Sequence, residues 1–128
     1  LSDGLPSLLQ YRLPMSAAPR SMDGELLFKA LEQQSVTMIV ARATDGILTS
    51  KNWKALRDDR NHFAPRQACL LVRQSLVSTQ PGLLPALAEL SGKISVEKMR
   101  QMNAQVDISH LSANQVAAAF LETAGLMK

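Results

Sequence analysis

The sequence has little cysteine: Cys69 is the single one in 128 residues. No disulfide can therefore form within the chain, and because Cys69 lies in the apolar run ACLLV, we expect it to be a small buried side chain. No apolar run approaches the roughly 20 residues that cross a membrane. The first ten residues, LSDGLPSLLQ, contain neither a charged leader nor a cleavage pattern, so any export signal is expected to be absent already.

Charge clusters and catalytic motifs are lacking as well. The chain carries 14 Lys and Arg against 11 Asp and Glu, and its basic residues are scattered, which does not favour nucleic acid as a partner. His62 and His110 stand apart from cysteines and from carboxylates at metal-ligand spacing. The Ser, His and Asp residues form no nucleophile elbow, glycine-rich phosphate loop or paired-acid motif. We therefore expect no metal, no cofactor and no enzymatic activity.

Capping residues and apolar stripes predict that most of the chain is helical. Ser95 begins one expected helix, and Ser112 begins another with Gln115 in capping-box spacing and Gly125 as its stop. The expected helices run from after residue 3 to about residue 11, and over about 23–34, 82–91, 95–106 and 112–124. The side chains that we expect to face inward from the last three helices are Leu87, Met99, Val116 and Phe120.

Two segments have the composition of buried strands. The run VTMIVA is β-branched and continuously apolar, which predicts a strand over 36–43 that is buried on both faces of a mainly parallel sheet. QACLLV predicts a second strand, and Trp53 and Leu56 are the expected inward anchors of the polar segment between the two. The fold class is thus α/β and helix-rich. Two strands are too few for the three amphipathic helices that follow, so we expect part of the fold to be missing from this sequence.

Five motifs follow one another along nearly the whole chain. They are DGLPSLLQ, MDGELLFKALEQQSVTMIVARATDGI, LRDDRNHFAPRQACLLVR, QPGLLPALAELSGKISVEKMRQMNAQV and VAAAFLETAGL. Their order resembles the second half of the ABC-importer substrate-binding proteins for glycine betaine, choline and carnitine. The resemblance implies part of a type II periplasmic-binding-protein fold, in which two lobes close on a ligand at a hinge. Residues 1–67 would belong to the second lobe, and residues 68–128 would form a hinge strand and C-terminal helices that return to a missing first lobe.

The resemblance also indicates which residues would face a ligand. Relatives typically carry one tyrosine at the position of Arg42, in the stretch RATDG, and another at that of Arg66, in the stretch APRQA. In relatives these tyrosines belong to an aromatic cage that holds a quaternary ammonium ion. Carried over to this sequence, the ligand-binding residues would be Arg42, Thr44, Asp45, Arg66 and Gln67.

Arginine at the two cage positions changes the chemistry that the site offers. A guanidinium would repel a cation ~5 Å away by about 3 kcal/mol at an effective dielectric constant of ~20, before relaxation and screening. It binds a carboxylate well, through forked hydrogen bonds. We therefore expect Arg42 and Arg66 to shift the ligand preference from choline toward a carboxylate-bearing or anionic solute.

A simpler interpretation of the same residues stands beside this one. Arg42 would then be a solvated strand end, or would pair with Asp45, Asp58 or Asp59. Thr44 and Asp45 would cap the turn after the strand rather than contact a ligand. The two interpretations predict different responses of ligand affinity to substitution of Arg42.

The function that the resemblance implies is that of a substrate-binding component of an ABC importer. Such a protein binds a small solute without chemistry, and a membrane permease recognises its closed form in the periplasm or another extracytoplasmic space. An alternative is a ligand-sensing effector domain of a transcriptional regulator with the same type of fold, which an upstream helix-turn-helix would reveal. Without a first lobe, the apolar helices are expected to make the isolated chain self-associate, with exchange of those helices between protomers through residues 67–73 as one route.

Overall fold

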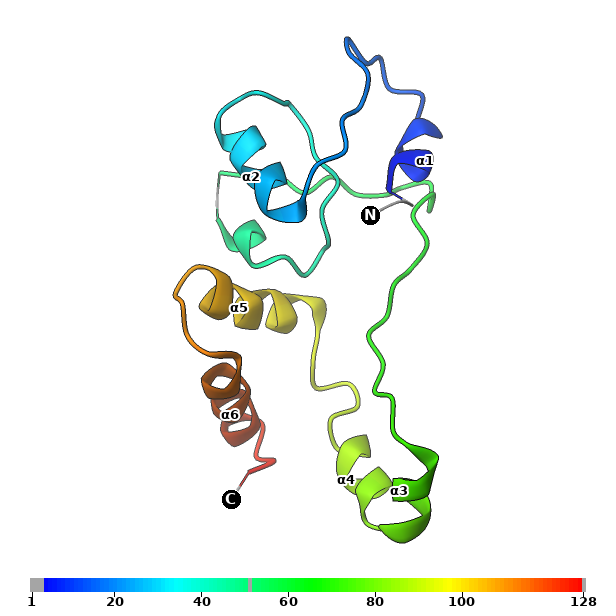
Figure 1. Cartoon of the computed structure of the whole chain (residues 1–128), viewed down its shortest axis with the longest axis vertical. Coiled ribbons are helices and arrows are strands. Elements are labelled where there is room, and N and C mark those ends of the chain that lie inside the picture. Colours follow the sequence, from blue (N-terminus) through cyan, green and yellow to red (C-terminus); the bar gives the residue numbers. More distant parts are fainter. Residues whose placement is uncertain (1–3, 51, 128) are drawn as a thin grey trace. The chain divides into compact units, whose positions relative to one another are not determined.

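A computed structural model describes residues 4–50 and 52–127, and helices joined by irregular connections make up this part of the chain (Figure 1). In chain order the elements are α1 (Gly4–Leu9), α2 (Gly24–Glu32), the 3₁₀ helix η1 (Gly46–Thr49), α3 (Gln74–Thr79), α4 (Leu83–Ala88), α5 (Val96–Asp107) and α6 (Ala113–Thr123). Within the described residues no segment forms a β-strand. The expectation of a helix-rich chain is confirmed, whereas the strands expected from its apolar runs are not found.

The helix predictions are most accurate where a cap marks the first turn. Ser95 caps α5, because its Oγ accepts the N–H of Lys98 at 3.1 Å. Ser112 and Gln115 form the predicted capping box of α6: Ser112 Oγ accepts the N–H of Gln115 at 3.3 Å, and Gln115 Oε1 accepts the N–H of Ser112 at 3.0 Å. Gly125 follows α6 with φ of 69°, a left-handed conformation that suits glycine and ends the helix.

Among the predicted helices, α4 differs most from its prediction. α4 has six residues and is shorter than the predicted 82–91, and neither its N-cap residue nor that of α3 makes a side-chain cap hydrogen bond. α3 and η1 were not expected from the sequence, because each is too short to show an apolar stripe.

Both strand predictions are wrong. Residues 36–43 and 67–72 form neither strand nor helix. A strand exists only through hydrogen bonds to a neighbouring strand, and a parallel sheet needs several such neighbours. The apolar composition of these segments is compatible with a strand in a sheet. Composition does not, however, supply the neighbouring strands that a sheet requires.

Two predictions of burial are also wrong. Cys69 is exposed, and Leu56 is 74% exposed, so neither lies in a core. Trp53 is half-buried. The burial of Cys69 was expected because ACLLV was interpreted as an internal strand, so it fails together with that strand.

The inward-facing positions of the C-terminal helices are partly confirmed. Val116 of α6 is buried, with 5% of its surface exposed. Leu87, Met99 and Phe120 are half-buried. The apolar stripes therefore point in the predicted direction, but little of the described chain covers them.

The described residues divide into two compact units. One contains the described parts of Leu1–Ala41 and Leu56–Arg66, and the other contains those of Arg42–Ala55 and Gln67–Lys128. The chain exposes 10589 Å² in all. Two separate, fully folded domains of this combined mass would expose only about 8,000 Å². Together, the two units thus expose more surface than self-sufficient domains of this mass would.

In the first unit, a carboxylate ties the end of α1 to a distant loop. Asp58 accepts the backbone N–H groups of His62 at 3.0 Å and Phe63 at 2.9 Å, and the hydroxyl of Tyr11 donates to its Oδ1. The ring of His62 meets that of Tyr11 edge-on with 5.0 Å between centroids, and the guanidinium of Arg60 lies 5.5 Å from the Tyr11 centroid. Asp58 therefore organises its own loop.

These contacts shift the titration of both bonded groups. The hydrogen bond from Tyr11 is the main cause that lowers the pKa of Asp58, and the two backbone N–H groups add to it. Partial desolvation, followed by the hydrogen bond to Asp58, raises the pKa of Tyr11. The pair is thus most stable with Asp58 ionised and Tyr11 protonated.

Candidate ligand-binding site

The stretch RATDG folds as a tight turn in the second unit. The N–H of Asp45 donates to the carbonyl of Arg42 at 3.1 Å, and the N–H of Arg42 donates to Oδ2 of Asp45 at 2.8 Å. Asp45 then precedes η1, where Leu48 N–H donates to the Asp45 carbonyl. This reciprocal pair of bonds is the turn-capping role that the simpler interpretation gave to Asp45.

Side chains of helix α5 hold this turn by donating hydrogen bonds to the backbone carbonyls of the turn. The Nε–H of Arg100 donates to the carbonyl of Ala43 at 2.8 Å, and Nδ2 of Asn103 donates to the carbonyl of Thr44 at 2.8 Å. Arg100 and Asn103 are three residues apart, so both project from the same face of α5. Two successive carbonyls of the turn are therefore fixed by one helix.

Gly46 lets η1 approach α5 closely. It is buried, and a Cβ at this position would lie 2.5 Å from the backbone nitrogen of Ala104 and 2.7 Å from its Cα. Such a clash with helix backbone cannot be relieved by rotation of a side chain. The glycine of RATDG is thus needed for contact between the turn and α5.

The structure brings three of the five candidate ligand residues together. Arg42, Thr44 and Asp45 share the turn; Arg42 is exposed, and the other two are half-buried. Arg66 and Gln67 are exposed and adjacent in sequence, but Arg66 belongs to the first unit, whereas Gln67 and the turn belong to the second. Their role as ligand residues stays a prediction.

Sequence reasoning did not identify Arg100 and Asn103 as neighbours of the turn. The available signal was the spacing of Arg100, Asn103 and Ala104, which places a long donor, a short donor and a small side chain on one helical face.

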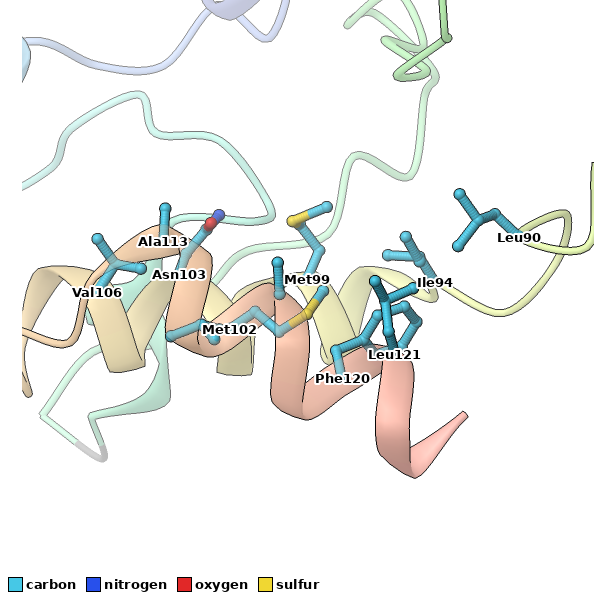
Figure 2. A pocket seen from close by; sticks show the side chains of 11 residues that line it. Leu90, Ile94, Met99, Met102, Asn103, Val106, Ala113, Phe120 and Leu121 are labelled. Carbon is cyan, nitrogen blue, oxygen red and sulfur yellow. The ribbon is translucent and has the colours of Figure 1, made fainter. Parts of the chain in front are cut away.

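An apolar groove lies between α5 and α6, with a volume of about 380 Å³ (Figure 2). Side chains of Met102, Phe120 and Leu121 meet there between the two helices. The remaining lining residues are Leu90, Ile94, Met99, Asn103, Val106, Ala113, Val116 and Ala117. Because this lining contains no charged side chain, the groove does not suit a charged solute as well as the turn does.

Two other kinds of site find no support in the described residues. Across 4–50 and 52–127, no three His, Cys, Asp or Glu side chains gather as metal ligands would. None of the helices in this part of the chain is long and apolar enough to cross a membrane.

Comparison with known proteins places the chain in a family. Residues 4–123 match the substrate-binding domain of the ABC-type glycine betaine transport system. The ergothioneine transport permease/ergothioneine binding protein EgtU of Helicobacter pylori is 32% identical over 105 residues, which cover 82% of this chain and 19% of that protein. The carnitine transport binding protein OpuCC of Listeria monocytogenes is 31% identical over 97 residues, covering 76% of this chain and 32% of that protein.

A third relative has a name that matches the family. The glycine-betaine-binding protein of Pseudomonas aeruginosa is 29% identical over 102 residues, which cover 80% of this chain and 33% of that protein. The chain thus spans a third or less of the length of these relatives. On the match of residues 4–123, the chain belongs to the family of substrate-binding domains of ABC-type glycine betaine transport systems.

Proposed function

We propose that the chain is part of the solute-binding component of an ABC importer of the osmoprotectant class. The observation that carries this proposal is the family match over residues 4–123. The names of three relatives describe proteins that bind carnitine, glycine betaine or ergothioneine, and none of these names describes an enzyme or a transcriptional regulator. Binding without chemistry is accordingly the activity to test first.

The ligand class follows from the chemistry of those three solutes. Glycine betaine, carnitine and ergothioneine each carry a trimethylammonium group and a carboxylate, whereas choline has no carboxylate. Arg42 and Arg66 can grip a carboxylate with paired N–H donors, but they repel an ammonium ion. We therefore propose that the arginines select a zwitterionic solute by its carboxylate, with Thr44 and Gln67 offering further polar groups to it.

The position of Arg42 supports this role. Its backbone is fixed by Asp45 at the start of a turn whose next two carbonyls are held by α5, and its side chain is exposed. A cation at a rigid, exposed turn can engage a solute without first losing backbone freedom. Asp45 then acts by holding the turn, in addition to any contact with the ligand.

The rest of the binding protein would complete the fold. Residues 1–67 would belong to the second lobe of a type II fold, and residues 68–128 would return to a first lobe. The excess exposed area and the open groove between α5 and α6 support such a missing partner. In the isolated chain, we expect the same apolar surface to cause self-association. The complete protein would act outside the cytoplasm, next to its membrane permease.

Calorimetry tests the proposed function directly. The protein encoded by the complete reading frame should be titrated with glycine betaine, carnitine, ergothioneine and choline. At least one zwitterion should bind at least tenfold more tightly than choline, a difference of about 1.4 kcal/mol. Arg42→Tyr and Arg66→Tyr should narrow this difference, because they remove the carboxylate partner and restore an aromatic ring.

The matched control is Arg57→Tyr, since Arg57 is exposed and lies outside the two candidate stretches. It should leave all four affinities unchanged. Absence of binding to every solute would contradict the proposed function. Tight binding of choline with no effect of either tyrosine substitution would instead remove Arg42 and Arg66 from the ligand site.

A further inference from the structure

One face of α5 contacts the turn of residues 42–46. This helix has an apolar side toward α6, and Arg100 and Asn103 form a polar edge beside it, where Asn103 also lines the apolar groove. The polar edge uses its donors on main-chain carbonyls of the turn. Its role is therefore to fix the path of the turn backbone rather than to supply groups for a ligand.

We infer that Arg100 and Asn103 are positioning residues for solute binding, which act through the backbone of residues 42–46. The inference rests on the proposed function and deepens it, because it assigns the affinity of the site partly to a helix that need not touch the solute. Neither residue was among the candidate ligand residues.

Contacts at three of the four residues from Ala43 to Gly46 set the orientation of the turn on α5. Arg100 binds the carbonyl of Ala43, Asn103 binds that of Thr44, and the backbone next to Asn103 closes on Gly46. Helix α5 therefore contacts the turn from Ala43 to Gly46, where η1 begins. Its own pair of hydrogen bonds, between Arg42 and Asp45, closes the turn but does not fix its orientation on the protein.

Substitution should affect the hydrogen bonds donated by Asn103 and by Arg100 to different extents. Asn103 uses one amide N–H group, so Asn103→Asp keeps the size of the side chain but puts a carboxylate oxygen against the Thr44 carbonyl. Arg100 donates from Nε, so Arg100→Lys keeps the charge and can still offer an N–H donor from a flexible chain. A positioning role thus predicts a large loss for Asn103→Asp and partial retention for Arg100→Lys.

The first test measures the turn itself and needs no ligand. Amide hydrogen exchange of Asp45, Leu48 and Ser50, whose N–H groups bond within the turn and η1, should become at least tenfold faster in Asn103→Asp. Gln105→Glu is the matched control, because it adds a carboxylate at an exposed position of the same helix. It should leave these exchange rates unchanged.

The second test links the turn to the solute in the protein from the complete reading frame. Its affinity for glycine betaine or carnitine should fall at least tenfold in Asn103→Asp and in Arg100→Ala, while Arg100→Lys regains part of the loss. Lys98→Ala removes a positive charge from the same helix and should not change the affinity. The helical circular dichroism signal should stay constant, which separates positioning from loss of fold.

The outcomes distinguish the inference from the proposed function. Faster exchange with unchanged affinity would overturn the positioning role, as would unchanged exchange in both Asn103→Asp and Arg100→Ala. If Asn103→Asp unfolds α5, Arg100→Ala and Arg100→Lys decide by the same two measurements. If the unmodified protein binds none of the solutes, the proposed function fails and the inference fails with it; accelerated exchange would then assign Arg100 and Asn103 to turn stability alone.

Discussion

Residues 96–123 and residues 67–72 are both rich in apolar side chains, but only the first region has regular structure. α5 and α6 close their backbone hydrogen bonds within each helix, and Ser95 and Ser112 satisfy part of their first turns. Residues 67–72 have strand composition, and a strand has no internal hydrogen bonds to close. The described residues thus supply the hydrogen bonds that the helices need, but not the neighbouring strands that residues 67–72 would need.

The turn of residues 42–46 lies between these two extremes. It begins at the end of residues 36–43, where the expected strand is not found. The turn is nevertheless ordered, because α5 supplies donors for its carbonyls. The turn is thus held by a helix and not by a sheet. Substitutions at the contact between the turn and α5, in the helices, and in residues 67–72 (the extended segment) should therefore change stability by clearly different amounts.

The largest effect is expected at the contact between η1 and α5. Gly46→Val would place a β-branched side chain against the backbone of Ala104, so the turn must leave the helix. We expect a loss of about 3 kcal/mol in the free energy of unfolding, at the upper end of ordinary overpacking. Urea unfolding followed by the fluorescence of Trp53 measures it.

Gly82→Ala is the control for this substitution, since a Cβ at Gly82 would meet nothing within 4 Å. It should change stability by less than about 0.5 kcal/mol. Equal effects of the two glycine substitutions would show that α5 does not hold the turn.

A smaller effect is expected from truncation between α5 and α6. Val116→Ala removes two methyl groups from a side chain that is 5% exposed, which should cost about 2 kcal/mol. Leu71→Ala, in the extended segment, truncates a side chain that is 94% exposed and should stay within about 0.5 kcal/mol. Thermal unfolding of both variants by circular dichroism would compare the two regions, and a larger loss at Leu71 would reverse our interpretation of them.

Removal of a helix cap should have a smaller effect again. Ser112→Ala deletes the side-chain acceptor of the α6 capping box, and we expect a loss of about 1 kcal/mol. Ser109→Ala, just outside the helix, is the matched substitution and should be close to neutral. Helical circular dichroism during urea unfolding measures both; no difference between them would mean that the box does not stabilise α6.

The smallest effect is a local one in the first unit. Its sign follows from the pKa of Asp58, which is lowered from its ordinary 3.8 in the folded chain. The carboxylate therefore stabilises its loop above pH 3.8, and this stabilisation is lost as the pH falls through the lowered pKa. The amide resonances of His62 and Phe63 should titrate with a midpoint below 3.8.

Tyr11→Phe sharpens this prediction by removing the main cause of the shift. The midpoint should then move up toward 3.8, because the hydroxyl no longer donates to the carboxylate. A midpoint that is unaffected by this substitution would assign the shift to the backbone N–H groups instead.

Local signals in the sequence account for what could be predicted. Ser95, Ser112 and Gly125 act within a few residues of the elements that they start or end, and the motif order identified the family. Strands at 36–43 and 67–72 could not be decided in this way, because a strand depends on hydrogen bonds to a distant segment, and no strand pair forms in the described residues. Composition alone therefore shows that a segment could form a strand, but not that it does.

The candidate site shows the same limit. The turn-forming tendency of Thr44-Asp45-Gly46 is local and was predicted, whereas the donors that hold it lie far along the chain. Arg100 is 57 residues from Ala43, and Asn103 is 59 residues from Thr44. No periodic pattern or cap connects residues at such separations, so the contact became visible only in three dimensions.

Hydrogen exchange over the whole chain tests the central claim most directly, since it reports on helices, turn and extended segments in one measurement. In the isolated chain we predict slow exchange in α5 and α6, intermediate exchange over 45–50, and no protection over 37–41 and 67–72. In the protein from the complete reading frame, the last two segments should become about a thousandfold or more protected, as central strands are. If they stay unprotected there, the extended segments are not strands awaiting partners, and the proposed completion of the fold is wrong.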